Sequence, residues 1–150
     1  MKKTFYILLI LPTIISAQLH LNAGVVDIQD RLDGNTLSWD VGHTEFIGKI
    51  GVGANFRSTM VKNDSYFTTE LNIKYRIEER NYRLDVGPGI GYNIEHQAIY
   101  PLITIRNSFK VGEDTWINVD FDNAYRGGFE TYLMVGFGLD INWLRCLCKP

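Results

Sequence analysis

The histidines and cysteines are the first residues that could carry chemistry, because metal sites need several such ligands at close quarters. The alternation of side chains described below predicts His20 within a strand, His43 in a turn and His96 in a loop at the opposite end. These three positions cannot form one metal site. Cys146 and Cys148 lie at the extreme end of the chain. We interpret them as part of a tail, with a redox or metal-binding role as the alternative.

Carboxylates form a second group with chemical potential. Asp120, Asp122 and Glu130 cluster near one predicted hairpin and could bind a cation, but such groups more often pair with arginines on the same face. The segment Gly87–Gly91 has the glycine spacing of a phosphate loop but neither its lysine nor a strand-turn-helix context. The sequence therefore predicts no catalytic residue, no metal and no cofactor, and the chain is not predicted to be an enzyme.

The elements that position these residues are β-strands, and the clearest strand is 129–143. Every second side chain of this stretch points to the same side of a strand, at ~3.3 Å per residue. The apolar face carries Phe129, Thr131, Leu133, Val135, Phe137, Leu139, Ile141 and Trp143. The opposite face carries Glu130, Tyr132, Met134, Gly136, Gly138, Asp140 and Asn142. A strand of this length can cross a tilted bilayer.

The same alternation recurs along the chain and predicts eight strands. We expect a turn at Gly42–Glu45, a polar loop from about Arg57 to Ser65, and a tight turn at Glu78–Asn81. Pro88 lacks an amide donor, so a bulge or local break is expected in its strand. A three-residue loop at Arg126–Gly128, with glycine in the left-handed conformation, would join the last two strands. The predicted fold class is an all-β, eight-stranded antiparallel up-and-down barrel.

The ends of the chain suggest export. Met1-Lys-Lys, an apolar run and Ile15-Ser16-Ala17 are typical of a cleaved signal peptide over residues 1–17. Residues 18–150 then form a single barrel domain, with strands to about residue 143 and a tail over 144–150. Loss of Lys2 and Lys3 with the signal leaves 17 acidic and 13 basic groups, a net charge of −4. This acidic balance argues against a nucleic-acid partner.

The face that lies inside distinguishes a membrane barrel from a soluble one. Eight glycines fall on the polar face, where a narrow lumen needs small residues: Gly24, Gly51, Gly53, Gly87, Gly89, Gly91, Gly136 and Gly138. The same face carries Asp40 and a predicted lumen charge network: Lys49, Glu70, Lys74, Arg76, Arg83, Asp85, Arg106, Asp120, Asp122, Glu130 and Asp140. Pairing Ile77 with Tyr82 across the Glu78–Asn81 turn would place Lys74 opposite Asp85.

The apolar face is then predicted to meet lipid. In the last strand the lipid-facing residues are Leu133, Val135, Phe137, Leu139, Ile141 and Trp143. Large aromatic residues lie near many strand ends on this face, as the interfacial girdles of a membrane barrel require. The alternative is a soluble, lipocalin-like barrel, in which the faces are exchanged and the aromatics fill a core.

The chain resembles the small eight-stranded outer-membrane barrels of Gram-negative bacteria, the group of OmpX, Ail and the OmpA transmembrane domain. The resemblance rests on the architecture and on the segments Val86–Tyr92 and Leu133–Trp143. It implies an outer-membrane location, lipid and the barrel-assembly machinery as partners, and a structural or surface-interaction role with a surface or envelope protein. Trp143 could be the terminal aromatic signal of that group, although seven residues follow it. A soluble periplasmic barrel that binds an apolar ligand and a narrow ion-conducting pore are the alternatives.

Overall fold

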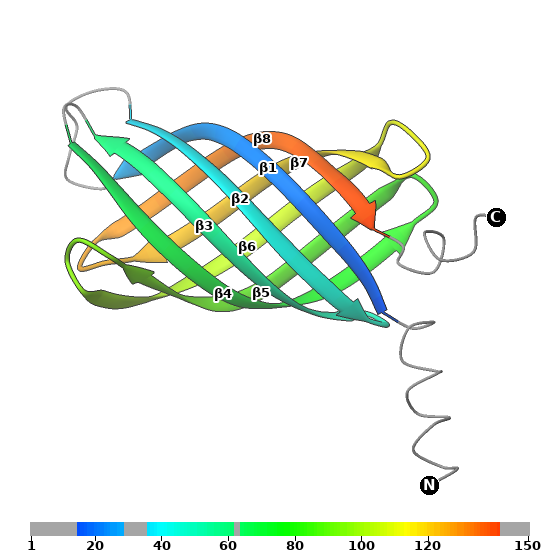
Figure 1. Ribbon diagram of the computed structural model, residues 1–150, viewed down its shortest axis with the longest axis horizontal. Helices are drawn as coiled ribbons and strands as arrows, with labels where there is room; N and C mark the ends of the chain where they lie inside the picture. Colours follow the sequence, from blue (N-terminus) through cyan, green and yellow to red (C-terminus); the bar gives the residue numbers. More distant parts are fainter. Residues whose placement is uncertain (1–14, 29–35, 62–63, 142–150) are drawn as a thin grey trace, which may run out of the picture.

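Eight strands form a closed antiparallel barrel in the computed structural model, which describes residues 15–28, 36–61 and 64–141 (Figure 1). The strands are β1 (Ile15–Ile28), β2 (Thr36–Ile47), β3 (Ile50–Val61), β4 (Asp64–Glu79), β5 (Tyr82–Asn93), β6 (Ala98–Lys110), β7 (Thr115–Tyr125) and β8 (Phe129–Ile141). Each strand pairs with the next, and β8 closes the barrel on β1, with Ile141 opposite Ala17. The predicted up-and-down architecture is confirmed. Among the described residues, no helix is long and apolar enough to cross a membrane.

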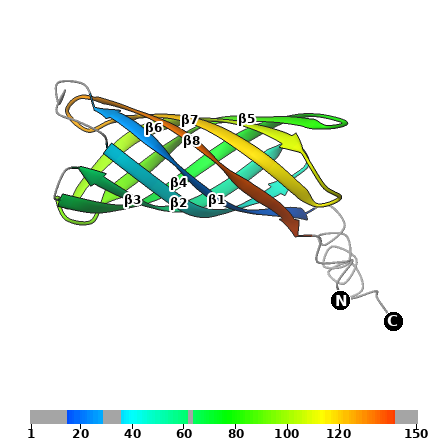
Figure 2. The same cartoon turned by 90° about the horizontal axis from the view of Figure 1, so that it is seen from above.

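The two ends of the barrel differ in their connections. At the turn end, β2–β3 and β4–β5 are joined by the two-residue turns 48–49 and 80–81, and β6–β7 by residues 111–114. The first residues of β1 and the last of β8 lie at this end as well. The loop end holds the connections 94–97 and 126–128, together with the last residues of β1 and β3 and the first residues of β2 and β4. Both ends can be followed in the view from above (Figure 2).

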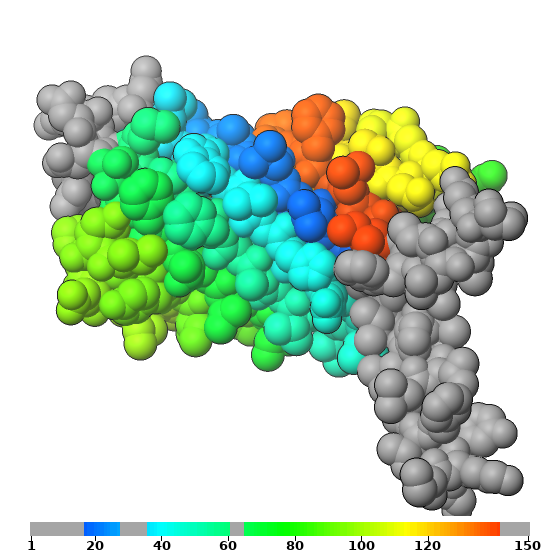
Figure 3. All heavy atoms as spheres, viewed as in Figure 1, coloured from blue at the N-terminus to red at the C-terminus, as the bar shows by residue number. Residues whose placement is uncertain are grey.

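Polar side chains line the inside of the barrel and apolar side chains cover its outside. In β4, Glu70, Asn72 and Lys74 are buried, whereas Leu71 and Ile73 between them are more than half exposed. In the space-filling picture, atoms of β1–β4 cover the middle of the wall that faces the viewer (Figure 3). Soluble proteins rarely expose continuous apolar surface on this scale. The arrangement is therefore the reverse of that in a soluble protein.

The β2–β3 hairpin turns later than expected. Residues Gly42–Glu45, predicted as a turn, are part of β2, and the chain reverses at Gly48 and Lys49. Gly48 has a φ of 62°, which glycine adopts without steric cost. Large aromatic residues were expected on the outward apolar face, but Phe46 points inside and is 1% exposed, whereas Ile47 is outside. The apolar Phe46 can lie in the polar lumen because its ring packs under the guanidinium of Arg76. Its apolar character therefore did not indicate which face it lies on.

The predicted polar loop from about Arg57 to Ser65 is also wrong. β3 continues to Val61 and β4 begins at Asp64, and both strands remain paired to their ends. Arg57 and Thr59 point inside and are buried. Hydrophilic residues at the end of a strand resemble a loop in sequence, but here they satisfy the requirement of the lumen for polar groups.

The β4–β5 hairpin is tighter than predicted. Ile77 pairs with Leu84 rather than Tyr82, and the turn consists of Arg80 and Asn81 alone. The predicted pairing of Lys74 with Asp85 is therefore wrong, because Arg76 occupies the position opposite Asp85. The break predicted at Pro88 is found in the pairing with β4 alone, because β5 itself is continuous and Pro88 pairs with Ile103 of β6. The β4–β5 pairing stops at Asn72↔Gly89 and resumes in the same register at Tyr75↔Val86.

The β7–β8 connection has the predicted geometry. Tyr125 pairs with Phe129 across three loop residues, and Gly127 has a φ of 81°. A residue with a Cβ rarely adopts this conformation. The odd number of loop residues keeps Tyr125 and Phe129 on the same outward face, where their rings lie 5.2 Å apart.

Candidate functional site

Arg57 is the centre of the charged interior. Its guanidinium lies 3.2 Å from the Asp40 carboxylate and 3.1 Å from that of Glu70, and it also contacts Asp122. These acids come from β2, β4 and β7, so one side chain of β3 connects opposite walls of the barrel. The guanidinium also stacks 4.3 Å from the centre of the Tyr132 ring. A fully buried cation of this kind requires several compensating partners.

A second arginine extends the cluster. Arg106 of β6 donates to the Asp120 carboxylate of β7 over 2.5–2.9 Å. The Asn22 amide donates to both Asp40 and Asp120, over 2.8 and 3.0 Å, and so connects the two arginine clusters. His20 Nε2 lies 3.8 Å from Oδ1 of Asp40, the same oxygen to which the Asn22 amide donates. The cluster therefore joins six strands, β1–β4, β6 and β7, in the middle of the barrel.

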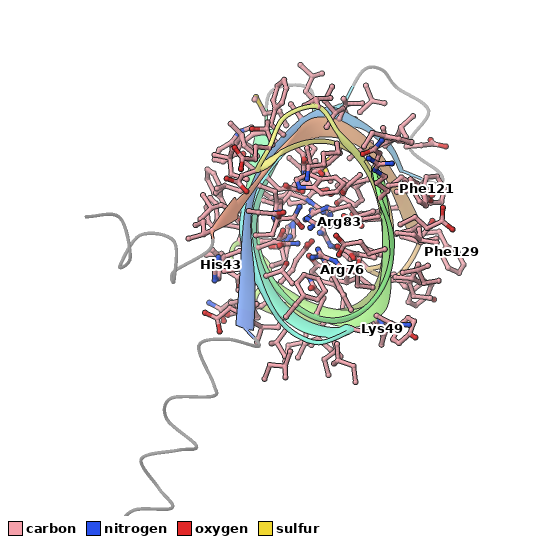
Figure 4. All side chains as sticks on the ribbon, turned by 90° about the vertical axis from the view of Figure 1, so that its right-hand side faces the viewer. His43, Lys49, Arg76, Arg83, Phe121 and Phe129 are labelled. Atoms are coloured by element: carbon pink, nitrogen blue, oxygen red, sulfur yellow. The ribbon has the colours of Figure 1, made fainter. Side chains whose placement is uncertain are left out.

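Two further arginines fill the turn end, and both lie inside the ring of strands in Figure 4. Arg76 donates two 2.8 Å hydrogen bonds to Asp85 and one of 3.0 Å to Gln18. Its guanidinium lies 3.5 Å from the centre of the Phe46 ring. A bidentate pair with a stacked ring fixes the guanidinium plane as well as its position.

Arg83 is held in the same way closer to the rim. Its Nη1 donates to both oxygens of Asp140 over 2.7 Å, and its Nη2 lies 2.9 Å from Glu78. The guanidinium covers the Trp116 ring at 3.8 Å from the ring centre. The Trp116 indole N–H donates to Asp140 over 2.9 Å, so the tryptophan is held by the same acid as the arginine.

The loop end is filled by an arginine among tyrosines. Arg126, from the β7–β8 loop, lies 3.0 Å from Glu130 and donates to the Tyr100 hydroxyl over 2.8 Å. Its guanidinium lies 4.0 Å from the centre of the Tyr100 ring and 5.0 Å from that of Tyr66. Burial alone lowers the pKa of Arg126, but Tyr132, Tyr100 and Glu130 outweigh burial and raise it above its ordinary value. The guanidinium is therefore a permanent cation.

Glycines make room for the inward rings. A Cβ on Gly51 would collide with the Phe46 ring, and one on Gly91 would collide with the Tyr100 ring. A Cβ on Gly87 would meet the backbone of Ile73 in the neighbouring strand. The glycines on the polar face therefore serve close packing inside the barrel.

The structure places most of the predicted network inside the barrel. Buried interior positions are held by Glu70, Lys74, Arg76, Arg83, Asp85, Arg106, Asp120, Asp122 and Glu130, and Asp140 is half-buried at the turn end. Lys49 was wrongly predicted in the lumen. It lies in the β2–β3 turn, exposed and outside the wall (Figure 4), because the hairpin reverses at that residue. The acids that could bind a cation are each engaged by an arginine, namely Asp120 by Arg106, Asp122 by Arg57 and Glu130 by Arg126.

Arg57 is the main residue that the sequence interpretation missed. It was placed in a loop, although the inward series Gly51, Gly53, Asn55 continues to it at intervals of two residues. Arg126 was correctly placed in a loop, but its inward side chain has no periodic signal.

Outward positions of β8 match the predicted apolar face. Leu133, Val135, Phe137 and Leu139 are about half exposed or more, and Ile141 is partly exposed. Trp143 lies outside the described residues, as do Cys146 and Cys148. Phe121 and Phe129 point away from the barrel in Figure 4.

The histidines are dispersed. His20 is buried inside, His96 lies in the 94–97 loop, and His43 lies on the outer face of β2 rather than in a turn. In the described part of the chain, no group of three or more His, Cys, Asp and Glu side chains is placed to hold a metal ion.

Solved structures with the same fold are small membrane barrels. The N-terminal β-barrel domain of Pseudomonas aeruginosa OprF aligns with a TM-score of 0.65 at 12% identity, over 84% of this chain and 97% of that one. Neisserial surface protein A aligns with a TM-score of 0.60 at 7% identity, over 83% and 96%. Ail of Yersinia pestis, solved with the heparin analogue sucrose octasulfate, aligns with a TM-score of 0.56 at 11% identity, over 85% and 97%. No protein-family model and no curated protein sequence matches the chain. The fold is therefore that of the small outer-membrane β-barrels.

Proposed function

We propose that the chain is a transmembrane β-barrel of the outer membrane of a Gram-negative bacterium, with a structural or surface-interaction role and a lumen plugged by side chains. The observation that carries this proposal is the reversal of its faces. Arginines and carboxylates are buried inside, whereas Leu, Ile, Val and Phe side chains are exposed around the outside. Moving one such apolar side chain from water into an apolar medium is favourable by about 1.5–3 kcal/mol. A lipid environment supplies that medium.

A soluble barrel with an apolar ligand fits the interior less well. The buried apolar cluster is small and consists of Val26, Tyr100, Leu102, Ala124, Tyr132 and Met134. The tyrosines in it are hydrogen-bonded to the Glu70 and Glu130 carboxylates. An apolar ligand would have to displace charged groups that pair with one another.

The tight connections support an orientation. Outer-membrane barrels have short turns on the periplasmic side and longer loops outside. By this rule, the turn end would face the periplasm and the loop end the exterior. The proposal includes a signal peptide over residues 1–17 and insertion by the barrel-assembly machinery. Mass spectrometry of the purified protein tests the signal peptide, because cleavage after residue 17 would leave Gln18 as the N-terminal residue.

Arginines at both ends and in the middle of the lumen support the proposal that side chains plug it. Arg126 stacks on tyrosines at the loop end, Arg83 covers Trp116 at the turn end, and Arg57 crosses between them. An eight-stranded barrel is just wide enough for side chains to fill.

A narrow pore is the second candidate, and the observation that favours it concerns buried polar atoms. Within the described residues, both polar atoms of the Asn72 side chain, Nε2 of Gln18 and Nδ2 of Asn118 have no hydrogen-bond partner in the protein. Buried polar groups are generally satisfied by protein or water. Water is therefore expected between the side chains of the lumen.

Fractionation with heat-modifiability tests the membrane proposal. The expressed protein should sediment with the outer membrane and migrate differently on a gel before and after boiling. Recovery in the soluble periplasmic fraction would favour the lipocalin-like alternative. Recordings in planar bilayers separate a plugged barrel from a pore.

A further inference from the structure

Three hydrogen-bonded pairs of polar side chains lie on the outer face of the described strands. The Tyr82 hydroxyl donates to Asn107 over 2.7 Å, and the Thr131 hydroxyl donates to Asn123 over 2.9 Å. Neither of these two pairs contains a charged group. The third pair, His43 and Glu45 of β2, contains a carboxylate and is joined by one 3.3 Å contact between Nε2 and Oε1. It is therefore the pair that differs in charge.

The register places Glu45 at the level of the aromatic residues near the turn end. Glu45 is one outward position before Ile47, which pairs with Ile50, which in turn pairs with Tyr75 of β4. The outward Tyr75 belongs to the aromatic residues that would lie at the membrane interface. Glu45 therefore lies at the depth of lipid headgroups and not in the aqueous phase.

The surroundings of the carboxylate are apolar. In the chain that begins at Gln18, the cross-strand neighbour of Glu45 is Val52 on β3, and those of His43 are Leu19 on β1 and Ala54 on β3. The Glu45 side chain is 60% exposed and that of His43 is 39% exposed, and His43 is seen outside the wall in Figure 4. Among the described residues, only His43 hydrogen-bonds to the Glu45 carboxylate. Oε1 is thus the oxygen that contacts the ring, and no described residue hydrogen-bonds to Oε2.

We propose that Glu45, oriented by His43, binds the primary ammonium group of an ethanolamine phospholipid headgroup at the turn end of the barrel. This inference rests on the proposed function, because it requires the outer face to meet lipid. A carboxylate at a membrane surface is incompletely hydrated, and a cation that arrives with the lipid itself compensates its charge. The apolar neighbours Leu19, Val52 and Ile47 offer contacts to the acyl chains of the same lipid.

His43 is a positioning residue in this site. Its Nδ1 is buried without a hydrogen-bond partner in the protein, so the ring presents Nε2 to Glu45 and does not reach the headgroup through Nδ1. The recognition chemistry is the hydrogen-bond donation of the ammonium group. A trimethylated headgroup has the same charge but no N–H donor.

The experiment uses the full barrel in nanodiscs of identical acyl chains, followed by release and native mass spectrometry of retained lipid. The headgroup series is ethanolamine, N-methylethanolamine, N,N-dimethylethanolamine and choline, with glycerol as the anionic comparison. Retention should decrease along the series as N–H donors are lost. Glu45→Gln should reduce ethanolamine-lipid retention about two- to fivefold, the range for a half-exposed charge pair. Glu79→Gln, which changes an exposed carboxylate at the end of β4, is the matched control and should retain the lipid.

Two variants of His43 distinguish its hydrogen bond to Glu45 from the mere volume of its side chain. His43→Gln keeps a donor for the carboxylate and should retain most of the binding, whereas His43→Leu should lose about as much as Glu45→Gln. Equal retention of ethanolamine and choline lipids, preference for the glycerol lipid, or a protein in place of a lipid on this face would overturn the inference. Failure of the barrel to enter any nanodisc would instead contradict the proposed membrane location.

Discussion

Arg76 and Asp85 lie directly opposite each other in the β4–β5 ladder, and the guanidinium donates 2.8 Å hydrogen bonds to both carboxylate oxygens. Both side chains are buried at the turn end of the lumen. The pair joins two neighbouring strands next to their turn, while the contact of Arg76 with Gln18 extends it to β1. The pair therefore determines the register of the hairpin and contributes to barrel closure.

Removing one partner of this pair should be more damaging than removing both. We expect Arg76→Gln and Asp85→Asn each to lower the free energy of unfolding by about 3–5 kcal/mol, because each leaves a buried charge without its partner. The double variant should lose less than the sum, by about 0.5–3 kcal/mol. Urea unfolding from lipid vesicles measures all three, with the exposed Arg80→Gln as control. Additive losses would mean that the two groups do not interact.

Arg57 should be the least replaceable residue of the lumen. Arg57→Met leaves Asp40, Glu70 and Asp122 close together without their shared cation, and should cost at least about 3–5 kcal/mol. Adding Asp122→Asn should restore part of the loss, since it removes one of the repelling carboxylates. Lys49→Met, which changes an exposed cation in a turn, should stay within about 0.5 kcal/mol of the parent. Equal effects of the Arg57 and Lys49 changes would contradict the central position of Arg57.

Neighbouring positions of β8 should respond oppositely to size and charge. Val135 is 55% exposed on the outer face, so Val135→Leu should be tolerated, whereas Val135→Arg should cost about 2–4 kcal/mol near the bilayer midplane. Gly136→Leu should also impair folding, because even a Cβ there would meet the Leu21 backbone. Folding yield in vesicles measures each variant. Normal folding of both Val135→Arg and Gly136→Leu would mean that the faces are assigned the wrong way round.

The purified barrel should show at most small, erratic conductance in planar bilayers. Arg57, Arg83 and Arg126 cross or cover the lumen, and each is held by carboxylates and aromatic rings. Arg83→Ala uncovers Trp116 and should increase the conductance without producing a stable open state. A steady ion-selective current in the parent, with its preference reversed by Arg106→Glu, would establish the pore instead of the plug.

The number of strands and their two faces could be predicted from the sequence because both depend on local alternation. The series Leu133, Val135, Phe137 and Leu139 identifies a strand without reference to any other part of the chain. The β7–β8 loop was predictable for a related reason. Its length is constrained by the need to keep Tyr125 and Phe129 on one face.

Strand ends and partners were decided by the tertiary structure. In the β4–β5 hairpin, a four-residue turn would place Lys74 opposite Asp85, whereas the two-residue turn places Arg76 there. Both turns leave the same side chains on each face, so the alternation in the sequence could not distinguish them. The strand nature of Arg57 was hidden because polar residues at a strand end resemble a loop until a lumen is present to receive them.

Alternation along the sequence by itself determined which side chains share a face, because successive residues of a strand point to opposite sides. Only the closed barrel decided which of those side chains meet. Arg57 and Asp122 are 65 residues apart, on strands that are not neighbours, and they touch because closure of β8 on β1 brings opposite walls within one side-chain length. Contacts across a lumen depend on strand number and stagger, which are properties of the whole sheet.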